Sequence, residues 1–214
     1  MPNRVGAGAV SWGQPRGAAA TGPARFGSPE KAKLGIDGAS DITALPGGKF
    51  AVVADRRDLL YLTDGKTVTA QLHLPGVKDG GSMMEGVAFD PENNHLYITR
   101  EEKHELVRFE WNPAEGKKPN YDKKFELSDG GPTNKGFEGL AFMPASLSPT
   151  GQSMVVLAKE SSPREILFRG SNGGGKDLRL ELDDDAKKKC KDFSAVAVDP
   201  KPSWGTSVVR SSVA

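Results

Sequence analysis

Six acidic residues recur at matching places of a repeated pattern, and they are the side chains best suited to chemistry. Three open short apolar segments, and three follow the next apolar segment of the same repeat. Carboxylates that converge repel one another unless a proton or a cation neutralises them. Ca²⁺ prefers oxygen ligands and tolerates irregular geometry. We therefore expect a calcium site at the first set, Asp41, Glu85 and Glu138, with the second set, Asp55, Glu101 and Glu160, contacting the bound ligand or supporting the metal-binding residues.

The second set has an alternative interpretation. Each of these acids could be neutralised by a basic neighbour or could cap a turn instead of facing a ligand. The basic residues close to them in the sequence are Arg56, Arg57, Arg100, Lys159 and Arg164.

Other reactive side chains are few. Three histidines and one cysteine, Cys190, make a zinc or copper site an unfavoured interpretation. No serine stands in a nucleophile elbow. His104 follows Glu101 closely and is the one candidate for a general acid or base, so the catalytic residues stay unknown.

The acidic pattern belongs to a repeat. Met84–Pro91 (MEGVAFDP) returns as Phe137–Pro144 (FEGLAFMP), and more distantly as Ser40–Pro46 and Phe193–Pro200. The copies begin at 41, 85, 138 and 194, so they are spaced by 44, 53 and 56 residues. Periods of this size are typical of β-propeller blades, each with four strands. The sequence therefore predicts an all-β protein with a propeller architecture.

Each of the first three repeats divides into four apolar segments separated by Gly- and Pro-containing turns. In an up-and-down blade, strand one is innermost, and its start lies on the same face as the end of strand two. The six acids are therefore expected at one mouth of the central channel. The predicted strands are 42–45, 50–54, 59–63 and 67–74, then 87–89, 96–99, 106–111 and 124–127, then 140–142, 154–158, 166–169 and 178–182.

The fourth repeat is incomplete. Residues 193–198 supply its first strand and 206–209 its second, which gives about three complete blades and part of a fourth. A propeller normally closes with four to eight blades, and an unclosed one exposes strand edges. We interpret the chain first as a fragment of a five- or six-bladed propeller. The alternatives are that copies complete one another by self-association, or that the N-terminal residues contribute unrecognised strands.

Composition narrows the function classes. Lys plus Arg is 29 and Asp plus Glu is 28, so the chain lacks the cationic excess of a nucleic-acid binder. No apolar run is long enough for a transmembrane helix. Residues 1–36 are rich in Gly, Ala and Pro and are expected to form a flexible tail without an export signal. The propeller is expected over 37–210, with a short tail at 211–214.

A family resemblance adds to this interpretation. Asn134–Phe142 (NKGFEGLAF), Leu157–Arg164 (LAKESSPR) and Asp192–Val196 (DFSAV) resemble the SdiA-regulated β-propeller domain, and more distantly the phytase-like esterase domains. The resemblance covers about residues 37–200. It implies five or six blades and a periplasmic or extracellular location, and it is compatible with metal binding at the acidic mouth.

Three functions follow as hypotheses. The first is a Ca²⁺-dependent binding or scaffold module that holds a small polar ligand or a protein partner. The second is a metal-dependent hydrolase of carboxylic or phosphate esters, similar to an esterase or phytase. The third is a protein–protein platform that needs no metal. Because the sequence shows no nucleophile or base, it favours the first.

Overall fold

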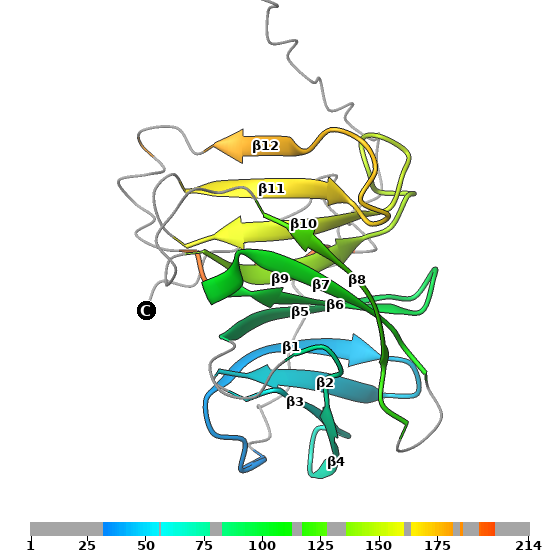
Figure 1. The fold of residues 1–214 in the computed structure, drawn as a ribbon, viewed down its shortest axis with the longest axis vertical. Coiled ribbons are helices and arrows are strands. Elements are labelled where there is room, and N and C mark those ends of the chain that lie inside the picture. Colours follow the sequence, from blue (N-terminus) through cyan, green and yellow to red (C-terminus); the bar gives the residue numbers. More distant parts are fainter. Residues whose placement is uncertain are drawn as a thin grey trace, which may run out of the picture.

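The computed structural model describes residues 32–55, 57–77, 83–112, 117–127, 136–160, 164–181, 185 and 193–199. The described part forms three four-stranded antiparallel sheets, stacked side by side in Figure 1. Each sheet is one sequence repeat, and its strands neighbour one another in chain order. The sheets are therefore the three predicted blades.

All twelve predicted segments form strands. The first blade contains β1 (Ala39–Leu45), β2 (Lys49–Ala54), β3 (Leu59–Thr63) and β4 (Val68–His73). The second contains β5 (Met84–Asp90), β6 (His95–Arg100), β7 (Glu105–Glu110) and β8 (Asn120–Glu126), with the short 3₁₀ helix η1 (Glu101–Lys103) after β6. The third contains β9 (Phe137–Met143), β10 (Met154–Lys159), β11 (Glu165–Gly170) and β12 (Leu178–Glu181). The main difference is β8, which begins at Asn120 rather than at Lys124.

The first strands of the blades lie next to one another. β1 contacts β5, and β5 contacts β9, so these strands form the inner row of the assembly (Figure 1). Contact between strand one of successive blades is what radial repetition requires. The predicted all-β propeller architecture is confirmed for these three blades.

Apolar side chains fill the spaces between the blades. Between the first and second blades, Leu60 and Val53 of one sheet meet Leu96 and Phe109 of the other, all of them fully buried. A second cluster joins the second and third blades. Because strand residues alternate between the two faces of a sheet, the central blade can contribute to both clusters.

A polar contact also joins the second and third blades. The Tyr97 hydroxyl and the Arg108 Nη1 both donate to the carbonyl oxygen of Ser171, at 2.9 Å each. Arg108 is anchored within its own blade by an ion pair with Asp122. Arg108 therefore fixes the turn after β11 against the outer half of the second blade.

The described part of the fourth repeat packs on the third blade. Phe193 and Val196 are buried against Met154 and Val156 of β10. Residues 193–199 thus lie where the inner strand of a following blade would lie, although they form no strand ladder with the described residues. The predicted second strand at 206–209 lies outside the described residues.

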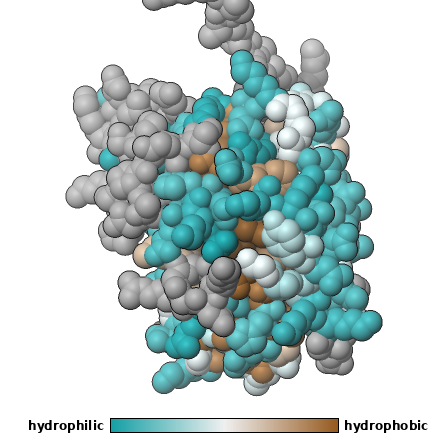
Figure 2. All heavy atoms as spheres, in the orientation of Figure 1, coloured by the Kyte–Doolittle hydropathy of each residue, from teal (hydrophilic) through white to brown (hydrophobic). Residues whose placement is uncertain are grey.

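The surface is mixed in character. Figure 2 shows apolar residues between predominantly hydrophilic side chains on the visible face. Among the described residues, no helix is long and apolar enough to cross a membrane. The predicted tails at 1–36 and 211–214 lie mostly or wholly outside the described residues.

Candidate acidic site at one end of the inner strands

One backbone hydrogen bond recurs in all three blades and fixes where the acids lie. The residue after strand two donates its N–H to the carbonyl oxygen of the residue just before strand one: Asp55 to Gly38 (2.8 Å), Glu101 to Met83 (2.9 Å) and Glu160 to Gly136 (3.1 Å). The end of strand two is therefore closed against the start of strand one. As predicted, both sets of acids gather at the same end of the blades.

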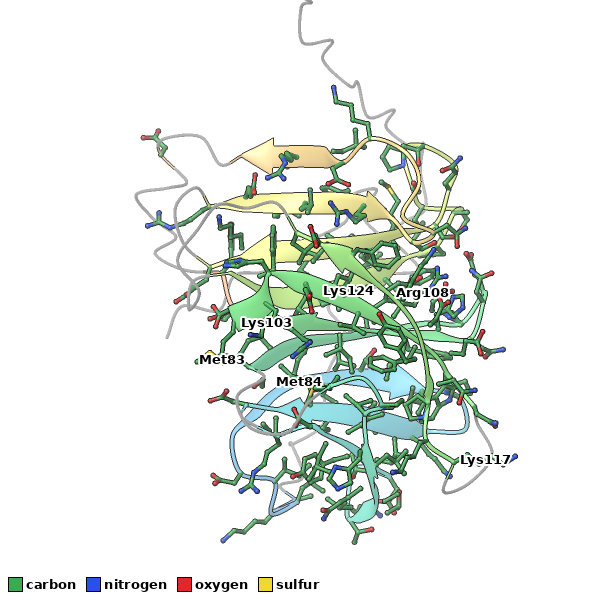
Figure 3. The ribbon with its side chains drawn as sticks, in the orientation of Figure 1. Met83, Met84, Lys103, Arg108, Lys117 and Lys124 are labelled. Carbon is green, nitrogen blue, oxygen red and sulfur yellow. The ribbon has the colours of Figure 1, made fainter. Side chains whose placement is uncertain are left out.

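Figure 3 shows which end of the sheets this is. Met83 and Lys103, which flank Glu85 and Glu101 in the sequence, lie toward one end of the sheets. Arg108 and Lys117 lie toward the other end. The acidic end is therefore separate from the polar contact made by Arg108.

Three glutamates form the tightest acidic group among the described residues. Glu101, Glu138 and Glu160 each offer a carboxylate oxygen, and these oxygens lie within 4.8 Å of one another. We call these residues the glutamate triad. Glu138 was predicted as a metal ligand, whereas Glu101 and Glu160 were predicted to lie behind it. The structure brings all three together.

Glu101 reaches the triad by crossing from the second blade to the third. Its Oε1 accepts a hydrogen bond of 2.8 Å from the backbone N–H of Gly136, just before β9. Only 5% of the residue is exposed. A Cβ atom at Gly136 would lie 3.0 Å from the Glu101 Cγ, so the glycine makes room for the glutamate stem.

The acids crowd one another electrostatically. Burial raises the pKa of Glu85, a hydrogen bond from Ser40 lowers it, and the negative charges of Glu101, Asp55 and Glu160 raise it further. Burial also raises the pKa of Glu101, with further raising by Glu160 and Asp55. Glu85 therefore lies in the field of the triad. A cation at this end of the blades would be stabilised by several carboxylates.

Asp41 differs from the position that the sequence suggested. Val52, Ile98 and Leu157 each stand three residues before an acid of the second set, so they occupy equivalent places. Their ladder partners are Ile42, Val87 and Leu140. Asp41 is thus the equivalent of Gly86 and Gly139, and Ser40 is the equivalent of Glu85 and Glu138.

This one-residue difference sends the Asp41 side chain to another partner. One oxygen accepts a hydrogen bond from the Val87 N–H of the second blade, and the other accepts one from the Ile42 N–H, both at 2.8 Å. Burial raises the pKa of Asp41 to about 6, and these two bonds counteract the rise. Asp41 is not among the triad and joins two blades instead.

The basic residues near the acidic end of the blades differ in their partners and in their burial. Arg100 pairs with Glu105 at 3.1 Å, and Lys124 pairs with the same glutamate at 2.6 Å. His104 adopts the left-handed conformation after η1, with φ 49°, and its electrostatic interaction with Glu101 lowers the pKa of that carboxyl. Lys159 is fully buried next to Glu160. Lys159 was named from the sequence as a basic neighbour that could neutralise Glu160, whereas the hydrogen bond from Ser40 to Glu85 was not predicted.

The fold and the site together define a β-propeller unit with an acidic end to its inner strands. The chain belongs to the SdiA-regulated family, whose family model matches residues 32–204. The chain has no match among curated protein sequences.

Solved structures with the same architecture are distant in sequence. Hydrazine synthase from Kuenenia stuttgartiensis is 16% identical with a TM-score of 0.51, over 82% of this chain and 43% of that one. The allergen Mala s 1 from Malassezia sympodialis is 18% identical with a TM-score of 0.50, over 78% and 47%. The β-propeller domain of Cps50 (Swd1) from Myceliophteria thermophila is 13% identical with a TM-score of 0.43, over 67% and 43%. The chain spans less than half of each of these structures, and the likeness concerns the fold.

Proposed function

We propose that this chain is a β-propeller binding module that holds a Ca²⁺ ion at the glutamate triad. The observation that carries the proposal is the separation of at most 4.8 Å between the carboxylate oxygens of Glu101, Glu138 and Glu160. Oxygens that bind one Ca²⁺ at ~2.3–2.6 Å can be at most ~5 Å apart. The triad therefore has the dimensions of a calcium site before any rearrangement.

The chemistry of the surroundings supports a hard cation. Every ligand atom of the triad is a carboxylate oxygen, which suits Ca²⁺ better than zinc or copper. The raised pKa of Glu85 and of Glu101 reflects burial and mutual repulsion, which a cation would relieve. In this proposal Glu85 and Asp55 adjust the field around the ion, and Asp41 is not a ligand.

The ion would also provide a binding surface. Ca²⁺ takes about 6–8 oxygen ligands, and three glutamates leave coordination positions for water or for a polar group of a partner. A small ligand with hydroxyl or carboxylate oxygens fits such positions. If the protein works outside the cytoplasm, as the family resemblance implies, the dissociation constant for Ca²⁺ is expected on the order of 10⁻⁴–10⁻³ M, the range of extracellular calcium modules.

Calorimetry tests the calcium site. After treatment with EDTA and dialysis, the protein is titrated with Ca²⁺, and we expect binding of one ion. Glu138→Gln combined with Glu160→Gln should abolish this heat, because two of the three charged ligands are lost. Glu110→Gln, an exposed carboxylate at the end of β7, is the matched control and should bind Ca²⁺ as the unmodified protein does. Absence of binding in the unmodified protein would leave the metal-free interaction platform as the better function.

A second function, a metal-dependent hydrolase, is favoured by His104. This residue combines a left-handed backbone, which is uncommon outside glycine, with an electrostatic contact to Glu101. A base beside a metal ion could take a proton from metal-activated water. The assay is Ca²⁺-dependent release of p-nitrophenol from an acyl ester and from a phosphate ester. Turnover that disappears in both His104→Ala and Glu138→Gln would replace the binding module with a hydrolase.

A further inference from the structure

Lys159 is a charged side chain in a place where charge is costly. It is the last residue of β10, and its exposed fraction is 0%, which puts it among the largest fully buried side chains of the described residues. Lysine is almost never fully buried unless it is paired. The desolvation of an unpaired ammonium would cost several kcal/mol. A negatively charged partner is therefore expected close to the Lys159 ammonium.

The strand register places Lys159 next to the backbone positions that carry or bind the three glutamates. Lys159 lies opposite Phe137 in the ladder between β10 and β9. Glu138 follows Phe137, and Glu160 follows Lys159. Glu101 is bonded to Gly136, the residue before Phe137, at 2.8 Å. All three glutamates are thus attached within one residue of the Phe137–Lys159 pair.

The face of the sheet gives the direction of the side chain. Residues two apart in a strand point to the same face of the sheet. Val155 and Leu157, which precede Lys159 by four and two residues in β10, are buried in the cluster between the second and third blades. The buried Lys159 side chain therefore lies on the face toward the second blade, the same gap that Glu101 crosses.

The positions equivalent to Lys159 in the other two blades carry different residues. They hold Ala54 and Arg100, each directly before an acid of the second set. Arg100 pairs with Glu105 of its own blade at 3.1 Å. Arg100 and Lys159 both precede a glutamate of the triad, but among the three equivalent positions only Lys159 carries a fully buried charge.

We propose that the buried ammonium of Lys159 neutralises part of the glutamate triad and sets its preference for divalent cations. Three carboxylates carry a charge of −3, and one ammonium brings the total to −2, which matches one divalent ion. Without Lys159 the same group would favour a trivalent ion. The cation preference rests on the proposed calcium site, whereas the charge pairing stands without it.

A double-mutant cycle measured in EDTA tests the pairing without any metal. The variants are Lys159→Met, Glu138→Gln and the two combined, with stability measured by urea unfolding. Lys159→Met should lower stability by on the order of tenfold or more in the unfolding equilibrium constant, and Glu138→Gln should recover much of that loss. Glu110→Gln is the control and should be additive with Lys159→Met. Additive behaviour of Glu138→Gln would overturn the proposal.

A substitution that keeps the positive charge, together with measurements of metal binding, tests the cation preference. Lys159→Arg should fold and keep the wild-type preference between Ca²⁺ and Tb³⁺. Lys159→Met, measured in a stabilising buffer, should bind Tb³⁺ more tightly relative to Ca²⁺, by about tenfold for one unit of local charge. If Lys159→Met does not fold, recovery of folding in the combined variant supports the pairing, and failure of both that variant and Lys159→Arg overturns it.

The two proposals fail in different ways. Coupling between Lys159 and Glu138 without any Ca²⁺ binding would remove the calcium site and keep the buried charge pairing. Ca²⁺ binding by the triad with an additive cycle and an unchanged ion preference in Lys159→Met would keep the site and remove the role of Lys159.

Discussion

The carboxylate of Asp41 accepts a hydrogen bond of 2.8 Å from the backbone N–H of Val87, and this contact ties the first blade to the second. The equivalents of Asp41 in the next two blades are Gly86 and Gly139. A Cβ at Gly86 would lie 2.7 Å from the Leu140 Cβ, so the following blade comes too close there for any side chain. The same place of the repeat thus uses a polar bond at one blade interface and close backbone packing at the next.

The stability of the protein should depend on pH through Asp41. Burial raises its pKa from 3.8 to about 6, so the folded state holds the proton more tightly than the unfolded chain. The stability from this group is full below about pH 4 and is lost as the pH rises through about 6. We expect the free energy of unfolding to fall over this window by ~1–3 kcal/mol relative to Asp41→Asn. Urea unfolding of both proteins at half-unit pH steps measures the difference.

Asp37→Asn is the control for this pH series. Asp37 is exposed, only a few residues before Asp41. Its substitution should leave the difference curve flat across the same window. An equally flat curve for Asp41→Asn would contradict the raised pKa and the buried contact that causes it.

Substitution of Gly86 should separate the second and third blades. In Gly86→Ala the new Cβ would lie 2.8 Å from both the Glu138 carbonyl oxygen and the Thr99 Oγ1, in addition to the contact with Leu140. Overpacking of this kind costs ~1–3 kcal/mol, and backbone contacts cannot rotate away. Thermal unfolding should show the loss. Gly174→Ala, at a site with no atom within 4 Å of the added carbon, should be nearly neutral, and equal stability of the two variants would refute the steric argument.

The strands were predictable because their signals are local. Period-two alternation, as in Val68, Ala70 and Leu72, and turn residues such as Pro46 and Gly47 indicate where strands begin and end. Repetition at 44 to 56 residues then implied that one face would collect the starts of strand one and the ends of strand two. The structure confirms both features for the three described blades.

The register of β1 was harder to predict, although the sequence carries a signal for it. Glu85 and Glu138 stand six residues before the prolines that end their repeats, whereas Asp41 stands five before Pro46. β1 has a register shift between Ala39 and Asp41, but the first strands of the other two blades have the same shift at the equivalent place, so the shift does not set Asp41 apart. A slip of one residue moves a side chain to the other face of the sheet. That slip takes Asp41 out of the group that Glu138 joins.

The composition of the triad was not readable from strand positions alone. Glu101 was predicted to lie behind Glu138 because it follows strand two, which is farther from the axis than strand one. Its side chain is long enough to reach Gly136 of the next blade, and a glycine there leaves space for it. Such a reach depends on the distance between blades, which neither periodicity nor composition contains.

Arg108 should be a major stabilising contact between the outer halves of the second and third blades. Arg108→Met would remove the ion pair with Asp122 and the bonds to the Ser171 carbonyl and the Asn172 Oδ1. Loss of a largely buried charged partner leaves Asp122 uncompensated, and we expect a cost of ~2–4 kcal/mol in urea unfolding. The Ser171 carbonyl keeps its bond from Tyr97, which limits the loss.

Lys123→Met provides the matched comparison for Arg108. Lys123 is half-buried, and its Nζ donates an exposed hydrogen bond of 3.0 Å to the Asn172 carbonyl. Exposed contacts of this kind contribute ~0–1 kcal/mol, so this variant should stay close to the unmodified protein. If both variants lose the same amount, the burial of Arg108 does not decide its contribution.

Glu101 should show opposite effects for two substitutions, because its charge and its hydrogen bond act in opposite directions. Burial and the charges of Glu160 and Asp55 raise its pKa, so ionisation of Glu101 destabilises the folded protein relative to the unfolded chain. Glu101→Gln removes the charge and keeps an oxygen that accepts from Gly136, so it should unfold at higher urea than the unmodified protein in EDTA. Glu101→Ala loses the bond that joins the two blades and should cost ~1–3 kcal/mol.

The pH dependence separates these two effects of Glu101. A group with a raised pKa in the folded state contributes full stability below its unfolded pKa and loses it as the pH rises. The advantage of Glu101→Gln should therefore be present at pH 7 and absent at about pH 4, where the carboxyl of the unmodified protein is protonated. The deficit of Glu101→Ala should persist at both pH values, because the Gly136 N–H lacks its acceptor in each case. Added Ca²⁺ should reverse the order at pH 7, stabilising the unmodified protein more than Glu101→Gln, since only the ionised triad supplies three charged oxygens. A stabilising effect of Glu101→Gln that is unchanged at pH 4, or that survives saturating Ca²⁺, would show that repulsion within the triad is not its source.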